Sequence, residues 1–97
     1  MNVCLCRISV RIYGISSLKE KRRVSQSLIS KVRRRFNVAI SEVEHNDLWQ
    51  RLTLGIACVS NDGIYNNKLI DAVIDYIDRL DSESDVIECD KEVITGF

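Results

Sequence analysis

The stretch NVCLCRISVRIY, residues 2–13, alternates between two sets of side chains. Because successive side chains of a β-strand point to opposite faces, this period of two predicts a strand with one buried side. The inward set is apolar and comprises Cys4, Cys6, Ile8, Val10 and Ile12, whereas the outward set includes Arg7, Ser9 and Arg11. A strand of this kind needs an apolar layer on one face only.

Two helices with an apolar stripe can supply that layer. The first is predicted to follow Ser17, which forms a capping box with Glu20, and to end near Phe36. Its apolar residues recur with a period of 3.6: Leu18, Val24, Leu28, Ile29, Val32 and Phe36. The second runs over about residues 64–80, after the polar cluster at 60–63, on Leu69, Ile70, Val73, Ile74, Ile77 and Leu80.

Three further strands are predicted. One covers 37–44, with Val38 and Ile40 inward, and a polar turn at 45–47 joins it to the next. The strand at 48–59 has Leu48, Leu52, Leu54, Ile56 and Cys58 on one face, and the last strand covers about 85–94.

The resulting order is βαββαβ, in one domain over residues 1–97. Right-handed crossovers place both helices on the same face of a four-stranded antiparallel sheet, which is the ferredoxin-like α+β fold. The other face of the sheet, called the open face below, then has no helix to cover it. It is expected to carry Arg7, Ser9, Arg11, Trp49, Arg51, Thr53, Gly55, Ala57 and Val59.

The composition excludes several classes of protein. No apolar run approaches the roughly 20 residues that span a bilayer, and arginines at positions 7 and 11 interrupt any signal pattern, which predicts a cytoplasmic protein. The four cysteines, Cys4, Cys6, Cys58 and Cys89, contain no C-x-x-C pair, and the one histidine is distant in sequence. We therefore expect no metal and no cofactor, and interpret the cysteines as core fillers.

The net charge of zero conceals a strong division. Residues 1–36 hold ten Lys/Arg and one Asp/Glu, whereas residues 37–97 hold four Lys/Arg and thirteen Asp/Glu. Such asymmetry is a cue for an interaction surface. On the first helix, Lys19, Arg23 and Arg34 point directly away from the apolar stripe, and Arg22 and Arg33 flank them. Asp71, Asp75 and Asp78 share the outward face of the second helix.

Two interpretations of the basic helix remain open. The arginine guanidinium forms bidentate hydrogen bonds with phosphate oxygens, so this helix is suited to bind a nucleic acid. The alternative is a solvated face that keeps the chain soluble. The candidate nucleic-acid contacts are Lys19, Arg22, Arg23, Arg33 and Arg34, extended across the open face by Arg7, Arg11 and Arg51.

The open face lacks the features of an RRM platform, because its first strand has no central aromatic residue and its third has only Trp49. Small and apolar side chains there suit the approach of a second copy instead. The candidate dimer interface comprises Val3, Leu5, Trp49, Gly55, Ala57 and Val59. Trp49 is equally compatible with a packing role in the sheet.

An enzymatic function is not favoured. The polar constellation around the predicted hairpin is Glu42, Glu44, His45, Asp47 and Gln50, where histidine and carboxylates could bind a metal or move protons. Hydrogen bonding at a turn explains His45 and Asp47 more simply. The scattered glycines fit neither a phosphate-binding loop nor a dinucleotide fingerprint.

Several motifs resemble a known family. SLKEKRRV at 17–24 and DLWQR at 47–51 are similar to the YlxP-like family of small bacterial proteins of unknown function, with support at 35–38, 42–43, 54–55 and 59–62. The resemblance implies the ferredoxin-like fold and a genomic neighbourhood of translation and ribosome-maturation factors, and hence an RNA or ribosome partner. The matched motif residues, with no role implied, are Lys19, Lys21, Arg22, Arg23, Trp49, Gln50 and Arg51.

The sequence therefore predicts a non-enzymatic RNA- or ribosome-associated protein that uses its basic first helix. The alternative is a homodimeric protein-interaction module that binds no nucleic acid.

Overall fold

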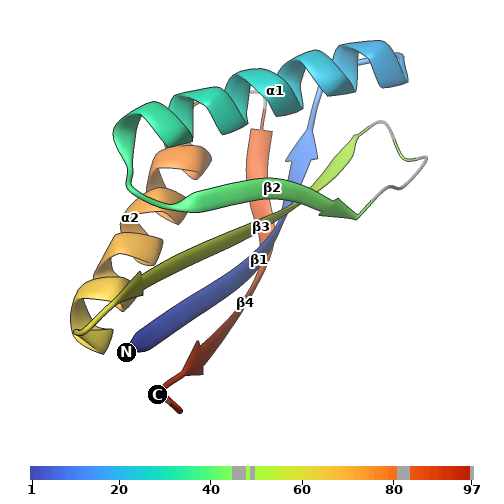
Figure 1. Ribbon diagram of the computed structural model, residues 1–97. Coiled ribbons are helices and arrows are strands. Elements are labelled where there is room, and N and C mark those ends of the chain that lie inside the picture. The colour runs from blue at the N-terminus through green and yellow to red at the C-terminus, as the bar shows by residue number, and fades with distance from the viewer. Residues whose placement is uncertain (45–47, 49, 81–83, 97) are drawn as a thin grey trace.

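The computed structural model describes residues 1–44, 48, 50–80 and 84–96. Its helices and strands follow the predicted βαββαβ order (Figure 1). They are β1 (Asn2–Ile12), α1 (Leu18–Arg35), β2 (Ala39–Glu44), β3 (Arg51–Ser60), α2 (Gly63–Leu80) and β4 (Ser84–Ile94).

The four strands form one antiparallel sheet in the order β2-β3-β1-β4. The two central strands pair without a shift, from Asn2 opposite Ser60 to Arg11 opposite Arg51. A register shift between Ser9 and Val10 interrupts the β1–β4 pairing, and another between Glu42 and Glu44 interrupts β2–β3. These β-bulges bend the two edge strands and re-aim nearby side chains.

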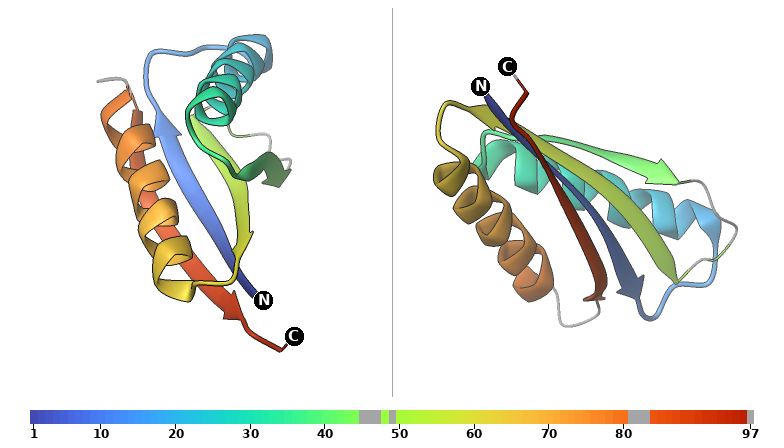
Figure 2. Two further views of the ribbon diagram at one scale, coloured as in Figure 1. Left: turned by 60° about the vertical axis from the view of Figure 1, so that its left-hand side comes forward. Right: turned by 90° about the horizontal axis from the view of Figure 1, so that it is seen from below.

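Both helices lie on the same side of the sheet (Figures 1 and 2). Helix α2 packs mainly on β1, β3 and β4, whereas α1 packs on β2. The core between them contains Ile8, Val10, Leu52, Leu54, Val32, Ile70, Val73 and Ile77, all fully buried. Burying each of these side chains stabilises the fold by roughly 1.5–3 kcal/mol. The inward side chains of the strands and those of the helices are therefore buried together in one core. This confirms the ferredoxin-like α+β fold. Neither helix is long and apolar enough to cross a membrane.

Two apolar side chains that we expected inside are exposed. Leu48 is expected on the inward face of the third strand, but that strand begins only at Arg51. The backbone turns first, since the amide of Arg51 donates to the carbonyl of Leu48. Leu18, in the first turn of α1, is also exposed.

The interpretation of all four cysteines as core fillers is wrong for one of them. Cys4, Cys6 and Cys58 are buried, but Cys89 is exposed. Cys89 lies on β4, an edge strand whose residues beyond Ile87 are all exposed up to Gly96, because α2 covers this strand only in part.

Candidate nucleic-acid interface

Helix α1 is fixed by its N-cap and its buried side. The Ser17 hydroxyl accepts a hydrogen bond from the Glu20 amide at 3.2 Å, and the Glu20 carboxylate accepts one from the Ser16 amide at 2.8 Å. This is the predicted capping box, with its return bond shifted to the residue before the cap. The buried side comprises Lys21, Ser25, Leu28 and Val32. Because this side is anchored, the opposite side of the helix must face solvent.

We call four cations on that solvent side the basic face: Lys19, Arg22, Arg23 and Arg34. Lys31 is exposed as well, on the flank of α1 nearer to the end of α2. All four are exposed, and none forms an ion pair with a described carboxylate. Lys19 and Arg23 are four residues apart, a spacing at which like charges repel by a few tenths of a kcal/mol. The basic face therefore holds uncompensated positive charge.

The other basic residues at the end of α1 turn toward the protein. The Arg33 guanidinium donates to the carbonyl of Ile40 in β2 at 2.9 Å. The Arg35 guanidinium lies 4.9 Å from the ring centre of Tyr76 in α2, in a cation–π contact. Tyr76 in turn meets Phe36 edge to face. Arg33 and Arg35 thus tie the C-terminal end of α1 to its neighbours.

The predicted extension across the open face has a different environment. Arg7 pairs with Asp90 at 3.2 Å and with Glu44 at 3.4 Å, and Asp90 raises the pKa of Arg7. Arg51 pairs with Glu88 at 2.9 Å and also donates to the Ser9 hydroxyl. These pairs lie on the face of the sheet opposite the helices, so Arg7 and Arg51 are separated from the basic face by the sheet itself.

Arg11 completes the predicted set on the open face. It is exposed, at the position where β1 pairs with Arg51 on one side and Asp85 on the other.

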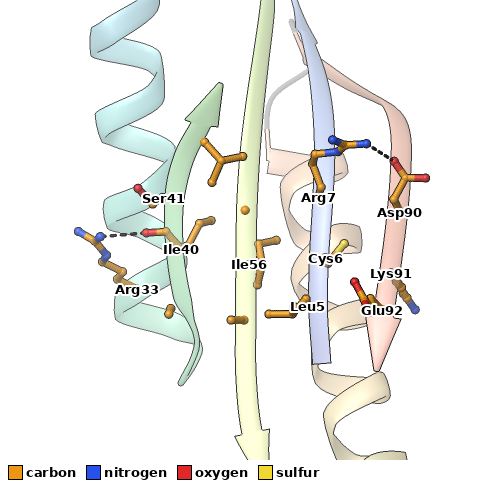
Figure 3. A pocket seen from close by; sticks show the side chains of 14 residues that line it. Leu5, Cys6, Arg7, Arg33, Ile40, Ser41, Ile56, Asp90, Lys91 and Glu92 are labelled. Atoms are coloured by element: carbon orange, nitrogen blue, oxygen red, sulfur yellow. Dashed lines mark hydrogen bonds and ion pairs between the residues drawn. The ribbon is translucent and has the colours of Figure 1, made fainter. Parts of the chain in front are cut away.

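Three of the predicted dimer residues, Leu5, Gly55 and Ala57, line a shallow hollow on the open face (Figure 3). The hollow has a volume of about 830 Å³, and Leu5, Ala39, Gly55 and Ala57 contribute its small and apolar lining. Val59 is 60% exposed, and Val3 is half-buried. Trp49 lies outside the described residues.

Comparison with known proteins identifies the family. Residues 3–91 match the family described as protein of unknown function (DUF503). The chain belongs to this family. Over 67 residues, which are 69% of this chain and 73% of the relative, it is 43% identical to the uncharacterized protein YlxP of Bacillus subtilis (strain 168). The resemblance inferred from the motifs is therefore confirmed.

A solved structure supports the fold of this DUF503 chain. The de novo designed protein Foldit4 superposes with a TM-score of 0.53, covering 98% of this chain and 99% of the designed one, at 18% identity. A likeness at this identity concerns the fold alone.

In this DUF503 chain the acidic outward face of α2 is largely engaged by its own neighbours. Asp71 accepts from Lys91 of β4, Asp75 pairs with Arg79 at 2.9 Å, and Asp78 accepts from the Val86 amide at 3.0 Å. The pair with Asp71 raises the pKa of Lys91. The contrast with the basic face is direct, because the carboxylates of α2 have partners and the four cations of α1 have no described ones.

The structure does not bring together the carboxylates that we considered as a possible metal or catalytic site around the hairpin. Glu42 accepts from Ser25 of α1, on the helix side of the sheet, whereas Glu44 pairs with Arg7 on the open face. The bulge between them turns them apart. His45 and Asp47 lie outside the described residues. Among the described residues, no group of His, Cys, Asp or Glu is suited to hold a metal ion.

The sequence analysis missed two features. Lys21 is 4% exposed, and its ammonium donates to the Leu48 carbonyl at 3.0 Å. At 100° per residue, Lys21 lies on the same side of α1 as the buried Leu28 and Val32. This position would have predicted its burial, but a lysine is normally expected to be exposed. The second feature is Val43, which covers Gly55 on the open face: a Cβ at Gly55 would lie 2.6 Å from Cγ1 of Val43.

Proposed function

We propose that this chain is an RNA-binding protein that acts by binding rather than by catalysis, and that the basic face of α1 holds the RNA backbone. The observation that carries the proposal is the set of four exposed cations without a described carboxylate partner, on a helix whose other side is buried. The resemblance to a family encoded near translation factors favours RNA among polyanions and implies action in the cytoplasm, with the ribosome as one candidate partner.

The spacing of the cations indicates the kind of anion. Lys19, Arg22 and Arg23 lie in the first two turns, and Arg34 lies in the last turn. Arg23 and Arg34 are eleven residues apart, which is about 16 Å along the axis at about 1.5 Å per residue. This separation exceeds the Debye length of about 8 Å at physiological ionic strength, so the two ends act independently. One phosphate cannot reach both ends, whereas a polymer of phosphates can.

The surface between the two ends is small and polar. Gln26, Ser27 and Ser30 are exposed there with Lys31 on the flank, and the outward side of α1 carries no aromatic residue. Base recognition in RNA usually relies on stacking and on contacts to base edges. We therefore expect contacts to phosphate and sugar, with little dependence on base sequence.

The placement of charge elsewhere favours α1 as the main contact. Arg7 and Arg51 are already paired with carboxylates and lie on the other side of the sheet. The open face beside them carries Glu88, Asp90 and Glu92, which repel a polyanion. Arg7, Arg11 and Arg51 remain proposed secondary contacts, reached only by an RNA that passes around the edge of the sheet.

Salt titration of RNA binding tests the proposal. With four phosphates neutralised on single-stranded RNA, log affinity should fall with log salt with a slope of about −3. The double variant Arg23→Gln/Arg34→Gln removes two contacts, so the slope should halve and affinity near 0.1 M salt should fall about 25-fold. The matched control, Lys68→Gln/Arg79→Gln, removes the same charge from α2 and should have a much smaller effect.

Two outcomes would reject RNA binding through α1. The first is no detectable binding to single-stranded RNA at low salt. The second is an equal loss of affinity in the two double variants, which would mean that net charge and not the basic face governs binding.

A second candidate function has support in the hollow of the open face. We infer that a homodimer would form there, because Val59 and Val43 are 60% and 51% exposed beside the small residues that line it. Sedimentation at several concentrations measures the association. Val59→Glu should prevent it, whereas Ile64→Glu, at the exposed start of α2, should not. A monomer at every concentration would exclude this function and leave RNA binding intact.

A further inference from the structure

Two of the four cysteines are in sulfur–sulfur contact across neighbouring strands. The Sγ atoms of Cys6, on central strand β1, and Cys89, on edge strand β4, are 3.6 Å apart. In the register of the two strands Cys6 lies opposite Lys91, and Cys89 lies opposite Ile8, so the two cysteines are diagonal neighbours on one face of the sheet. A disulfide bond has a sulfur–sulfur length of about 2.05 Å, so the atoms need to approach by only about 1.6 Å.

We propose that Cys6 and Cys89 are an oxidation site that forms a reversible intrachain disulfide with a peroxide as the oxidant. Cys89 is exposed and can meet the oxidant, whereas Cys6 is 3% exposed and lies behind it. β4 pairs with β1 on one side only and can adjust its position more easily than a central strand. This inference does not depend on RNA binding.

The reaction divides into two balanced steps. The Cys89 thiolate attacks one peroxide oxygen, an S–O bond forms, the O–O bond breaks, and the departing hydroxide takes a proton to become water. The Cys6 sulfur then attacks the sulfenic sulfur of Cys89, the S–S bond forms, and the hydroxyl group leaves with the Cys6 proton as water. Two thiols are oxidised and one hydrogen peroxide is reduced to two waters.

The surroundings assign the two roles. Burial, with the neighbouring Cys89, raises the pKa of Cys6 to about 12, so Cys6 stays a protonated thiol until the sulfenic acid is beside it. Lys91 lies opposite Cys6 in the strand register, and its ammonium donates to Asp71 and Asn67 of α2. The exposed Cys89 is therefore the sulfur that meets the peroxide.

The chain contains its own control. Cys4 and Cys58 also lie opposite each other, on β1 and β3, but both are buried. The Cys58 thiol donates to the Asn66 carbonyl, and burial raises its pKa. We expect this second pair to remain reduced under conditions that oxidise the first.

The test treats the folded chain with hydrogen peroxide at a small molar excess and maps disulfides by mass spectrometry without reduction. The expected result is a cross-linked peptide joining residues 6 and 89, an intact mass lower by two hydrogen atoms, and two remaining thiols, all reversed by dithiothreitol. Cys89→Ser, an exposed and conservative change, should abolish the cross-link. In the wild-type chain, a stable sulfenic or sulfinic acid at Cys89 without a cross-link would overturn the proposal. A disulfide between two chains, or one between Cys4 and Cys58, would overturn it equally.

Discussion

Gly55 lies at the centre of the open face, and Val43 occupies the space that a side chain there would need. A Cβ added at Gly55 would lie 2.6 Å from Cγ1 of Val43, and 3.6 Å from its Cβ and Cγ2. Carbon atoms pack best at about 3.5–4.0 Å, so one methyl group is too close by about 1 Å. Overpacking of this kind costs about 1–3 kcal/mol. Because Val43 is 51% exposed on edge strand β2 and can move, we expect Gly55→Ala to destabilise the fold by about 1–2 kcal/mol.

The sign of this effect should reverse when Val43 is shortened. Val43→Ala removes both γ-methyl groups and with them the close contact. Glycine inside a strand is less favourable than alanine by about 0.5–1 kcal/mol, so Gly55→Ala in the Val43→Ala background should stabilise the fold by about that amount. The coupling between the two sites is then about 1.5–3 kcal/mol.

Urea denaturation of the wild type, both single variants and the double variant measures this coupling, provided that the m-value is unchanged. Gly96→Ala is a control, since no atom lies within 4 Å of a Cβ at that position. An equal cost of Gly55→Ala in both backgrounds would show that Val43 does not cover Gly55 in solution.

Three further changes have outcomes that the structure fixes. The Thr53 hydroxyl is buried without a described partner, so Thr53→Val should leave the free energy of unfolding unchanged or raise it by up to about 1 kcal/mol, as urea midpoints would show. Asp62 accepts from the amides of Ile64 and Tyr65 as the N-cap of α2, and Asp62→Ala should lower thermal stability by about 1 kcal/mol; an unchanged melting temperature would contradict this role. Asp71 raises the pKa of Lys91 above 10.5, so the pair stabilises the fold below that pH and loses its effect as pH rises through the folded-state pKa. Asp71→Asn should therefore lower the free energy of unfolding by about 0.5 kcal/mol near pH 7. Above pH 10.5 this loss should shrink, and urea titrations of both proteins near pH 7 and above pH 10.5 would measure the difference.

Most of the fold could be predicted because burial on one side imposes a period on the chain. The alternation at 2–13 and the stripes of both helices gave element bounds within about two residues of those observed, except for the start of β3. That start was wrong because Leu48 fits the period while the backbone still turns at this point. Lys21 and Asn66 are buried against the expectation for their residue types. Each donates to a backbone carbonyl of a distant segment, and such a partner exists only after the chain has folded.

The candidate site could be predicted only where it depends on one helix. Lys19, Arg23 and Arg34 are exposed as the period of α1 predicts, because their direction follows from the buried side of the same helix. The surroundings of Arg7 and Arg51 depend instead on the register of β4 against β1, which includes a bulge after Ser9. No local pattern specifies where that bulge falls, so the pairing with Asp90 and Glu88 could not be inferred.

The register of β4 against β1 and the ion pairs of α2 also explain how a chain of zero net charge can present one basic surface without compensating carboxylates among the described residues. The described cations outside α1 that form ion pairs are Arg7, Arg51, Arg79 and Lys91. Arg7 and Arg51 pair across the open face, Arg79 pairs within α2, and Lys91 of β4 pairs with Asp71 of α2. Because ion pairs act over a few ångströms and longer interactions are screened within about 8 Å, the remaining carboxylates on the open face cannot neutralise α1 through the sheet. An approaching polyanion is therefore attracted on the helix side and repelled at β4. This difference orients the polyanion before any contact is made.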